Sequence, residues 1–320
     1  NKDRSTSGVK ENKFLGGYNL QYQFSSNLNL NAAYAFESRD YNSISDSPYD
    51  TYTTTADLEG FGYSKGSLSM YNFQDDSQTL ATTLNYAQEF GELDVKGKLN
   101  YTIEDRSTQS FQASGNDYLY KGLPTLDNFD SSTVSITSNS TTVRSQNYSA
   151  IIGLVFKDKY ILDGLWRNDG SSLFGPENKW NSYYRVSGAW RISEDFPIPG
   201  VDELKLNVAV GTSGQRPGFN WQYEQTSLSG GQLSSSRLKG NPKLKPSETT
   251  EMEVGLNVTF GDSRYTLEAA YSDQSTVDQF MAIGLFAPAS AGKNLQWQNV
   301  GDLEAKTIEA ALRADIFRDS

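Results

Sequence analysis

The sequence predicts an all-β protein, an antiparallel transmembrane β-barrel of which this chain forms a part. About eleven segments alternate strictly between apolar and polar residues, which is the period of a β-strand with two different surroundings. Each segment has roughly the ten residues that a tilted strand needs to cross a membrane. The connections between the segments alternate between short and long, as they do in outer-membrane barrels.

The composition excludes several classes of protein. The chain has 320 residues and contains no Cys and no His. Disulfides, cysteine nucleophiles, thiolate metal sites and the Ser-His-Asp triad are therefore ruled out, and no cofactor is expected. A net charge of −11 argues against nucleic-acid binding. The sequence contains no run of about 18 apolar residues, so it predicts no membrane-spanning helix.

The first predicted hairpin shows the alternation most clearly. A strand over Phe14–Phe24 places its aromatic and aliphatic residues at even positions, with Asn19, Gln21 and Gln23 between them. A tight turn at 25–27 leads into a second strand, Leu28–Phe36. One face of this hairpin is apolar and the other carries amides, as expected for a strand between lipid and water.

The same pattern predicts nine further strands. They are Thr79–Ala87, Leu93–Glu104, Asn147–Phe156, Tyr160–Arg167, Ser182–Ile192, Leu204–Val210, Glu251–Phe260, Arg264–Ser272 and Thr307–Phe317.

Two kinds of connection join these strands. The short turns are 25–27, 88–92, 157–159 and 261–263, and an eleven-residue connection, 193–203, lies at the same end. The long connections are about 38–77, 105–142, 213–250 and 277–305, with a shorter one at 168–179. This asymmetry predicts periplasmic turns and extracellular loops. Trp166 and Trp190 are expected at the membrane boundary, with Arg167 and Arg191 facing a wet lumen.

Two alternatives to a transporter barrel stay open at this point. A soluble antiparallel sheet protein would also alternate, but it usually has an apolar core and lacks the asymmetry of the loops. A passive porin or a surface adhesin barrel would fit the same strand pattern. Because an open sheet edge in lipid leaves backbone groups unpaired, eleven strands are interpreted as a fragment of a larger barrel.

A family resemblance narrows the choice. The segment 160–180 resembles the Arg-x-Asp-Gly-Ser-Ser-x-Phe-Gly motif of the SusC/RagA family of TonB-linked outer-membrane transporters. The segments 190–194, 203–217, 240–260 and 299–312 also resemble this family. The motif residues are Arg167, Asp169, Gly170, Ser171, Ser172, Phe174 and Gly175.

The resemblance implies a twenty-two-stranded barrel in the outer membrane of a Gram-negative bacterium, filled by a plug. Residues 1–320 would be part of the barrel domain, with the plug domain, the TonB box and the signal peptide absent from this stretch. It implies import of a nutrient, such as a glycan or a peptide, without enzymatic chemistry. The implied partners are TonB through the missing N-terminal region, a SusD-like surface lipoprotein, outer-membrane lipid and lipopolysaccharide, and the nutrient ligand.

The candidate contact residues are aromatic side chains in the predicted long loops. Flat rings stack on sugars and peptides, and Tyr and Trp retain a polar group. Packing within the loops or against a lid protein is the alternative for each ring. The Asn168–Ser172 segment is interpreted as a turn at the outer surface, and Glu251 and Glu253 as lumen lining rather than a catalytic pair. The candidates are Tyr118, Tyr120, Trp221, Tyr223 and Trp297.

Overall fold

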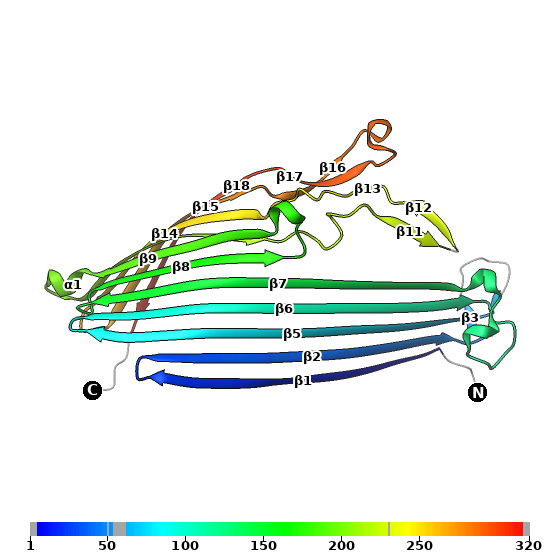
Figure 1. The fold of residues 1–320 in the computed structure, drawn as a ribbon, viewed down its shortest axis with the longest axis horizontal. Helices are drawn as coiled ribbons and strands as arrows, with labels where there is room; N and C mark the ends of the chain where they lie inside the picture. Colours follow the sequence, from blue (N-terminus) through cyan, green and yellow to red (C-terminus); the bar gives the residue numbers. More distant parts are fainter. Residues whose placement is uncertain (1–4, 50, 54–61, 230, 316–320) are drawn as a thin grey trace. The chain divides into compact units, whose positions relative to one another are not determined.

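The chain forms one eleven-stranded antiparallel sheet, as the sequence predicts. The computed structural model describes residues 5–49, 51–53, 62–229 and 231–315. The sheet order follows the chain order, so each strand pairs with the next one (Figure 1). Its strands are β1 (Thr6–Ser25), β2 (Leu28–Ser47), β5 (Ser67–Phe90), β6 (Leu93–Asn116), β7 (Ser135–Phe156), β8 (Tyr160–Ser171), β9 (Trp180–Arg191), β10 (Val201–Gln215), β14 (Ser247–Phe260), β15 (Tyr265–Val277) and β18 (Leu303–Ala314).

Smaller elements lie in the connections. Two-stranded sheets pair β3 (Thr51–Thr53) with β4 (Gly62–Ser64) and β11 (Thr226–Ser229) with β12 (Gln232–Ser235). A three-stranded sheet contains β13 (Leu238–Lys239), β17 (Leu295–Asn299) and β16 (Phe280–Gly284). The α-helix α1 (Ile192–Asp195) has a single turn. No helix among the described residues has both the length and the apolar character to cross a membrane.

All four predicted short turns are confirmed, and their backbone explains their composition. Gly91 and Gly261 have φ values of 63° and 68°, in the left-handed region that glycine adopts without strain. Lys157 and Asp158 both have φ of 55°, so this turn between β7 and β8 is built from residues that tolerate the region less well. The predicted strand 307–317 becomes β18, and residues 316 and 317 lie outside the described part of the chain.

The strand registers place Trp and Arg on opposite faces, as predicted. Trp166 lies directly across from Ala150 and Tyr184, while Arg167 lies across from Ser149 and Tyr183. Across the next pair of strands, Trp190 faces Leu206 and Arg191 faces Lys205. Successive side chains of a strand point to opposite sides, so one face of the sheet is apolar and the other polar.

Two rows of aromatic rings bound the apolar face. Near the short turns, Phe156, Tyr160, Trp190 and Phe196 follow one another with ring centroids 6.2–6.3 Å apart. Toward the other end, Tyr148 lies 4.7 Å from Tyr101 and 5.9 Å from Trp180. Trp180 and Trp190 lie ten residues apart, near the two ends of β9. Ten residues span about 33 Å along a strand, which projects to about 25 Å along the axis of a barrel with the usual strand tilt. This is the height of the lipid-facing band of an outer-membrane barrel.

Five strands continue well beyond that band, which the sequence did not predict. β1 and β2 have 20 residues each, β5 and β6 have 24, and β7 has 22. The predicted loops 38–77 and 105–142 were therefore too long, because apolar alternation stops where lipid contact stops while strand pairing continues. Polar cross-strand contacts replace it: Ser38 donates to Asp76 at 2.6 Å, and Asn72 donates to Asp40 at 3.0 Å.

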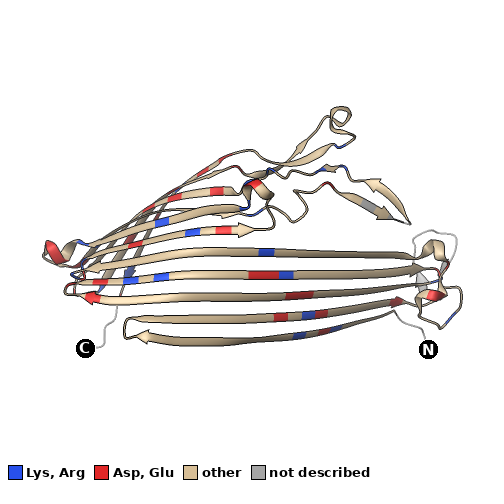
Figure 2. Cartoon of the chain, in the orientation of Figure 1, with Lys and Arg blue, Asp and Glu red and all other residues tan. Residues whose placement is uncertain are grey.

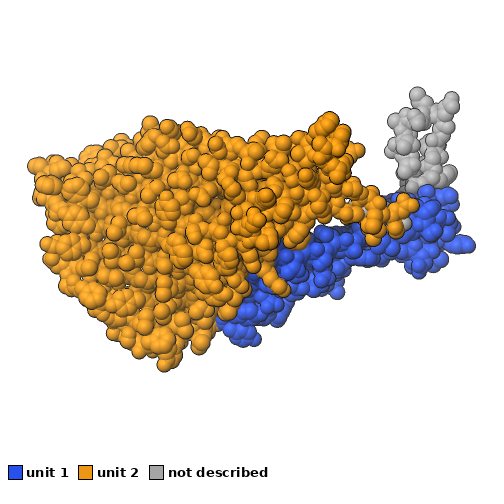
Figure 3. Space-filling view, turned by 45° about the horizontal axis from the view of Figure 1, so that its top comes forward, with its two compact units in different colours: residues 1–18, 34–79, 104–143 blue, residues 19–33, 80–103, 144–320 orange. Residues whose placement is uncertain are grey.

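The chain divides into two compact units (Figure 3). Unit 1 contains residues 1–18, 34–79 and 104–143, and unit 2 contains residues 19–33, 80–103 and 144–320. Unit 1 has a small hydrophobic core of Leu68, Tyr118 and Phe129, against which Tyr49, Met70, Leu126 and Val134 pack. In unit 2, the side chains of Phe174 and Leu244 are buried.

A single carboxylate organises the turn that follows β9. Asp195, at the end of α1, accepts hydrogen bonds from the hydroxyl of Tyr160 at 2.5 Å, Nε1 of Trp190 at 2.9 Å and Nζ of Lys159 at 3.0 Å. These donors, with the Tyr160 hydrogen bond as the largest contribution, lower the pKa of Asp195 to about 2. The turn thereby fixes two rings of the aromatic row.

Asp195→Asn is expected to lower the midpoint of heat-induced unfolding of the complete barrel. Folding lowers the pKa of this carboxyl from 3.8 to about 2, so its contribution is present above pH 4 and disappears as the pH falls toward 2. The difference in midpoint between the wild type and the variant should therefore shrink to zero over that interval. Asp158→Asn is the control, because Asp158 contacts Arg191 through its backbone carbonyl. A difference that does not depend on pH would contradict the role of the carboxylate.

The assignment of the two faces predicts opposite responses to a buried charge. Leu256 lies on the apolar face, and Asn257, the next residue, lies opposite Glu268 on the polar face. Leu256→Arg should cost about 2–4 kcal/mol when the complete barrel folds into lipid vesicles, if it lies near the middle of the membrane. Asn257→Arg should cost much less, because its side chain remains in water beside a carboxylate. Equal losses for the two variants would show that the faces are assigned wrongly.

Candidate functional site

The family-motif segment lies partly in a strand, which corrects the prediction of a turn at Asn168–Ser172. Asn168 to Ser171 belong to β8, and the first three of them pair with Ser182, Asn181 and Trp180 of β9. The chain turns only at 172–179, which includes the 3₁₀ turn Pro176–Asn178. Asp-Gly is a common turn sequence, but at this position the ladders with β7 and β9 hold it extended.

The motif residues of this loop are structural. The Phe174 side chain is 6% exposed, and Ser171 is fully buried. A Cβ atom at Gly175 would lie 1.9 Å from the carbonyl oxygen of Pro242, so only glycine fits there. Ser172 exchanges two hydrogen bonds with the backbone of Arg144, at 2.9 and 3.0 Å. These residues attach the loop to β7 and to the segment that precedes β14.

Asp169 joins two arginines on the polar face. Its carboxylate oxygens lie 3.2 Å from Nη2 of Arg167 and 2.8 Å from Nη2 of Arg216, and its side chain is 13% exposed. Arg216 follows β10, so this carboxylate connects the ends of β8 and β10. Nε of Arg167 is buried, and within the described residues it has no hydrogen-bond partner. The polar wall therefore contains a buried guanidinium N–H whose donor capacity the described residues leave unused.

Three connections of unit 2 are joined by the amide side chains of asparagine and glutamine residues. Asn241 donates to the carbonyl of Trp297 at 2.9 Å. Asn299 accepts from the backbone N–H of Lys245 and donates to its carbonyl, both at 2.9 Å, and also donates to the carbonyl of Asp278. The side chain of Gln222, which is buried, donates to the carbonyl of Ser172 at 2.9 Å. The connections after β8, β10 and β15 therefore form one folded assembly.

The predicted contact residues of unit 2 have different environments. Trp221 and Trp297 stack on each other, with ring centroids 3.8 Å apart and planes at 9°, and Phe280 packs edge-on against Trp221. Tyr223 is 49% exposed and lies 6.1 Å from the ring of Phe219. One face of each stacked Trp is thus occupied by the other, whereas much of Tyr223 remains accessible. Ligand contact by these three residues stays a prediction.

The predicted contact residues of unit 1 differ in the same way. Tyr118 is 4% exposed and packs on Phe129, with its hydroxyl donating to Asp46 at 2.7 Å. Burial, and then this hydrogen bond, raise the pKa of Tyr118 well above its ordinary value, so the hydroxyl remains a donor. Tyr120 is 69% exposed. Of the two, Tyr120 is the one whose ring a ligand can reach in this conformation.

Sequence reasoning did not identify a group of rings and charges on the polar face of unit 1. Tyr41 and Tyr71 lie 6.2 Å apart, Phe73 lies 6.5 Å from Tyr71, and the guanidinium of Arg39 lies 5.9 Å from the ring of Tyr41. These residues occupy odd positions of β2 and β5, on the face that also carries Asp75. The period-two pattern contained this signal, but the strands were predicted to end before it.

Ion pairs surround this group. Arg39 lies 2.7 Å from Glu11, Lys13 lies 2.8 Å from Glu37, and Arg106 binds Asp75 through two nitrogens. Figure 2 shows basic and acidic residues side by side near the middle of β1, β2, β5 and β6. Most of these charges are paired, so the net electrostatic potential of the surface is weak. What the surface presents to a ligand is mainly hydrogen-bonding groups and the faces of aromatic rings.

The polar face of unit 2 is richer in carboxylates. A groove of about 610 Å³ is lined by Asn207, Asn257, Glu253, Glu268 and Glu309, from β10, β14, β15 and β18. Glu251 and Glu253 line a second groove of about 390 Å³ together with Arg185. These positions agree with their interpretation as wall residues. Within the described residues, no group of three or more acidic side chains is placed to hold a metal ion.

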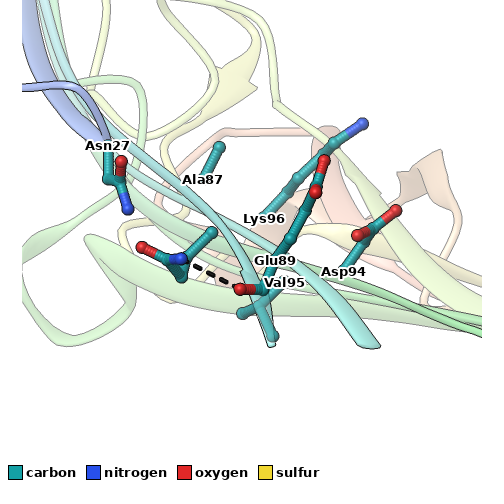
Figure 4. A pocket seen from close by; sticks show the side chains of 7 residues that line it. Asn27, Ala87, Glu89, Asp94, Val95 and Lys96 are labelled. Atoms are coloured by element: carbon teal, nitrogen blue, oxygen red, sulfur yellow. Dashed lines mark hydrogen bonds between the residues drawn. The ribbon is translucent and has the colours of Figure 1, made fainter. Parts of the chain in front are cut away.

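A third depression belongs to the short turns. It has a volume of about 370 Å³ and is lined by Asn27, Ala87, Gln88, Glu89, Asp94, Val95 and Lys96 (Figure 4). The hydrogen bond drawn there runs from the Gln88 amide to the carbonyl of Glu89 at 2.9 Å. Together with the bond from the backbone N–H of Ala87 to Asn27, these contacts shape the turns.

The fold and the two faces define the class of this protein. An antiparallel meander with an apolar band between aromatic rows, a polar opposite face, short turns at one end and structured loops at the other is part of an outer-membrane β-barrel. The family model "TonB dependent receptor-like, beta-barrel" matches residues 1–319, and the chain belongs to this family. The family consists of outer-membrane receptors that act in transport and not as enzymes.

Known relatives agree with the predicted resemblance to SusC and RagA. The chain is 26% identical to TonB-dependent receptor P26 of Formosa agariphila over 98% of its length, which is 32% of that protein. It is 28% identical to TonB-dependent receptor SusC of Bacteroides thetaiotaomicron over 52% of its length and 18% of SusC. A solved structure of the RagAB peptide transporter superposes with a TM-score of 0.85 at 19% identity, covering 98% of this chain and 35% of that one. The chain thus spans about a third of the length of these relatives or less.

Gly175→Ala is expected to loosen the motif loop while leaving the barrel folded. The new Cβ atom would collide with the backbone of Pro242, and backbone cannot move as a side chain can. Limited proteolysis of the folded receptor should then cut faster at 172–179. Gly284→Ala is the matched control, because a Cβ atom there meets nothing within 4 Å. Equal cleavage of the two variants would contradict the close approach.

Proposed function

We propose that this chain forms part of the barrel of a TonB-dependent importer that carries a nutrient, such as a glycan or a peptide, across the outer membrane. In this role its polar face lines the lumen and its structured loops contact the nutrient. A SusD-like surface lipoprotein would close over those loops, and TonB would act through the N-terminal region of the full-length protein. Residues 1–320 would then belong to the barrel domain, with the plug supplied by another part of the polypeptide.

The observation that carries this proposal is the polar face that runs through all eleven strands. In unit 2 it presents Asp169, Arg167 and a groove rich in carboxylates and amides. In unit 1 it presents the rings of Tyr41 and Tyr71 beside paired charges. A face of this kind suits a hydrated nutrient that needs both ring stacking and hydrogen bonds.

The similarity to known proteins supports a role in nutrient import. The relatives include a protein named SusC and a structure described as a peptide transporter. Their substrates are not transferred to this chain, because the alignment with SusC covers 18% of that protein. The stacking of Trp221 on Trp297 and the 49% exposure of Tyr223 make Tyr223 the better ligand candidate in that assembly.

A passive porin or adhesin barrel is the competing function, and dependence on energy separates the two. Uptake by the full-length receptor should be measured in cells with and without a functional TonB protein, using a panel of labelled oligosaccharides and oligopeptides. An importer should lose uptake of its substrate when TonB is absent or when an uncoupler removes the proton gradient. Uptake that continues unchanged would show a passive pore, and the lack of any uptake would favour an adhesin.

The polar-face rings give a residue-level test of the same proposal. Tyr41→Ala combined with Tyr71→Ala should weaken uptake at low substrate concentration roughly tenfold, since each lost ring contact is worth about 0.7 kcal/mol. Asn42→Ala combined with Asn72→Ala is the matched control on the opposite face, where the two amides bond each other at 2.9 Å. If both double variants transported alike, the rings would have no part in the substrate path.

A further inference from the structure

Arg185 is an arginine on the polar face of unit 2 whose guanidinium has no partner among the described residues. It lies in β9, six residues before Arg191 and on the same face, and it is exposed. Arg191 pairs with Glu194 at 3.2 Å and with Glu203 at 3.1 Å. The guanidinium of Arg185, by contrast, makes no ion pair and no hydrogen bond with any residue that the structure describes. The described chain therefore leaves the N–H donors of Arg185 unused.

The position of Arg185 is set by a glycine on the neighbouring strand. Gly211 of β10 lies directly across from it. A Cβ atom at Gly211 would lie 3.2 Å from Cγ and 3.3 Å from Cβ of Arg185. The aliphatic part of Arg185 therefore occupies the space that a side chain at position 211 would fill. This packing restricts the arginine before any ligand binds, which lowers the conformational entropy that binding would cost.

A groove separates Arg185 from a carboxylate on the far side of β10. Glu251 of β14 lies directly across from Gly211, so Arg185, Gly211 and Glu251 form one row over three strands. Neighbouring strands are about 4.8 Å apart, which puts the Cα atoms of Arg185 and Glu251 about 10 Å apart. Both side chains line the groove of about 390 Å³, together with the small residues Ala209 and Ser213. The two charges thus face each other over a space large enough for part of a nutrient.

The positive charge continues beyond one end of this groove. Leu165, which lies across from Arg185, lines the groove, and Arg167 follows two residues later on the same face of β8. Arg167 and Arg216 share the carboxylate of Asp169, at 3.2 and 2.8 Å. Two guanidinium groups thus divide one carboxylate between them, and the guanidinium of Arg185 has none. The wall is therefore basic beside β8 and β9 and acidic at β14.

This arrangement matches a ligand that carries a carboxylate next to hydrogen-bond donors. A guanidinium binds a carboxylate through two parallel N–H···O bonds, which a neutral group cannot reproduce. The carboxylates of Glu251 and Glu253, on the other side of the groove, accept hydrogen bonds from hydroxyl, amide or ammonium groups. A ligand with several acidic groups in this groove would be repelled by β14, and a ligand with none would leave Arg185 without a partner.

We propose that Arg185 binds a carboxylate group of the nutrient, and that the groups next to this carboxylate donate hydrogen bonds to Glu251. Arg185 is then a residue that determines specificity, and the nutrient belongs to a class that carries an acidic group. The inference rests on the proposed function in one respect, since it takes the polar face to be the path of the nutrient. A uronic-acid sugar and the C-terminal end of a peptide both supply this chemistry.

Matched pairs of acidic and neutral ligands test the proposal on the full-length receptor purified in detergent. The sugar pair consists of oligogalacturonates and their methyl esters, and the peptide pair consists of mixed-sequence tripeptides with a free or an amidated C-terminus. Apparent dissociation constants are measured by titration calorimetry for the wild type, Arg185→Gln and the control Arg313→Gln. The control removes the same charge from the polar face, where Arg313 is 75% exposed and already lies 3.4 Å from Glu268.

The wild type and Arg313→Gln should bind the acidic member of one pair roughly tenfold more tightly than the neutral member, which is the strength of a charge-assisted hydrogen bond. Arg185→Gln should bind both members of that pair alike. Arg185→Lys should keep part of the preference, because it retains the charge but not the planar fork. Gly211→Ala should also reduce the preference, since its Cβ atom would displace Arg185 without removing a charge. The pair that shows the preference identifies the source of the carboxylate.

Equal affinities within both pairs for the wild type, or no binding of any member, would overturn the proposal. A carboxylate from another part of the receptor is the competing occupant of the groove. In that case the wild type would show no preference, and Arg185→Gln would unfold at a lower temperature than Arg313→Gln without any ligand, which also overturns the proposal. Binding in detergent does not involve TonB, so a passive pore that prefers the acidic ligand would refute the proposed function and leave the role of Arg185 intact.

Discussion

Every backbone N–H and C=O group that enters lipid must be paired within the protein, and the rest of this structure depends on that constraint. Each unpaired group would cost several kcal/mol. Between neighbouring strands of the main sheet, from β1 to β18, the chain meets the requirement by antiparallel pairing through short turns whose glycines and polar residues accept positive φ. The short turns at one end of the meander set the register of each strand pair. Because side chains alternate between the two faces, this register also determines which side chains face lipid.

The two faces of the sheet then follow from their different solvents. Trp166 and Arg167 are neighbours in sequence but contact opposite surroundings, and the same holds for Trp190 and Arg191. The aromatic rows show where the lipid band ends. Beyond it, cross-strand contacts such as Ser38 with Asp76 hold the strands together in water. Strand pairing thus continues from the lipid band into water without a break. Only the residues on the outward face differ, being apolar within the band and polar beyond it.

The connections are folded structures with their own polar networks. Asn128 in unit 1 and Asn241 and Asn299 in unit 2 each bond several backbone groups, which the loops would otherwise leave unpaired. The family-motif residues Phe174 and Gly175 serve the same purpose through packing. This order leaves Tyr120 and Tyr223 as exposed rings on fixed supports, whereas Tyr118, Trp221 and Trp297 help to build the supports.

The sequence by itself determined the number of strands, the end of the sheet at which the short turns lie, the placement of Trp and Arg on opposite faces, and the family. These features follow from the alternation of apolar and polar residues, from turn chemistry and from a contiguous motif. It did not predict the full length of β2, β5 and β6, since alternation of apolar and polar residues vanishes once both faces are wet. It placed Asn168–Ser171 in a turn, because Asp-Gly usually turns and only the ladders to β7 and β9 keep it extended. Which loop aromatics are buried, and that Tyr41 meets Tyr71 from a strand thirty residues away, were decided by tertiary structure, because such contacts depend on strand register and loop packing.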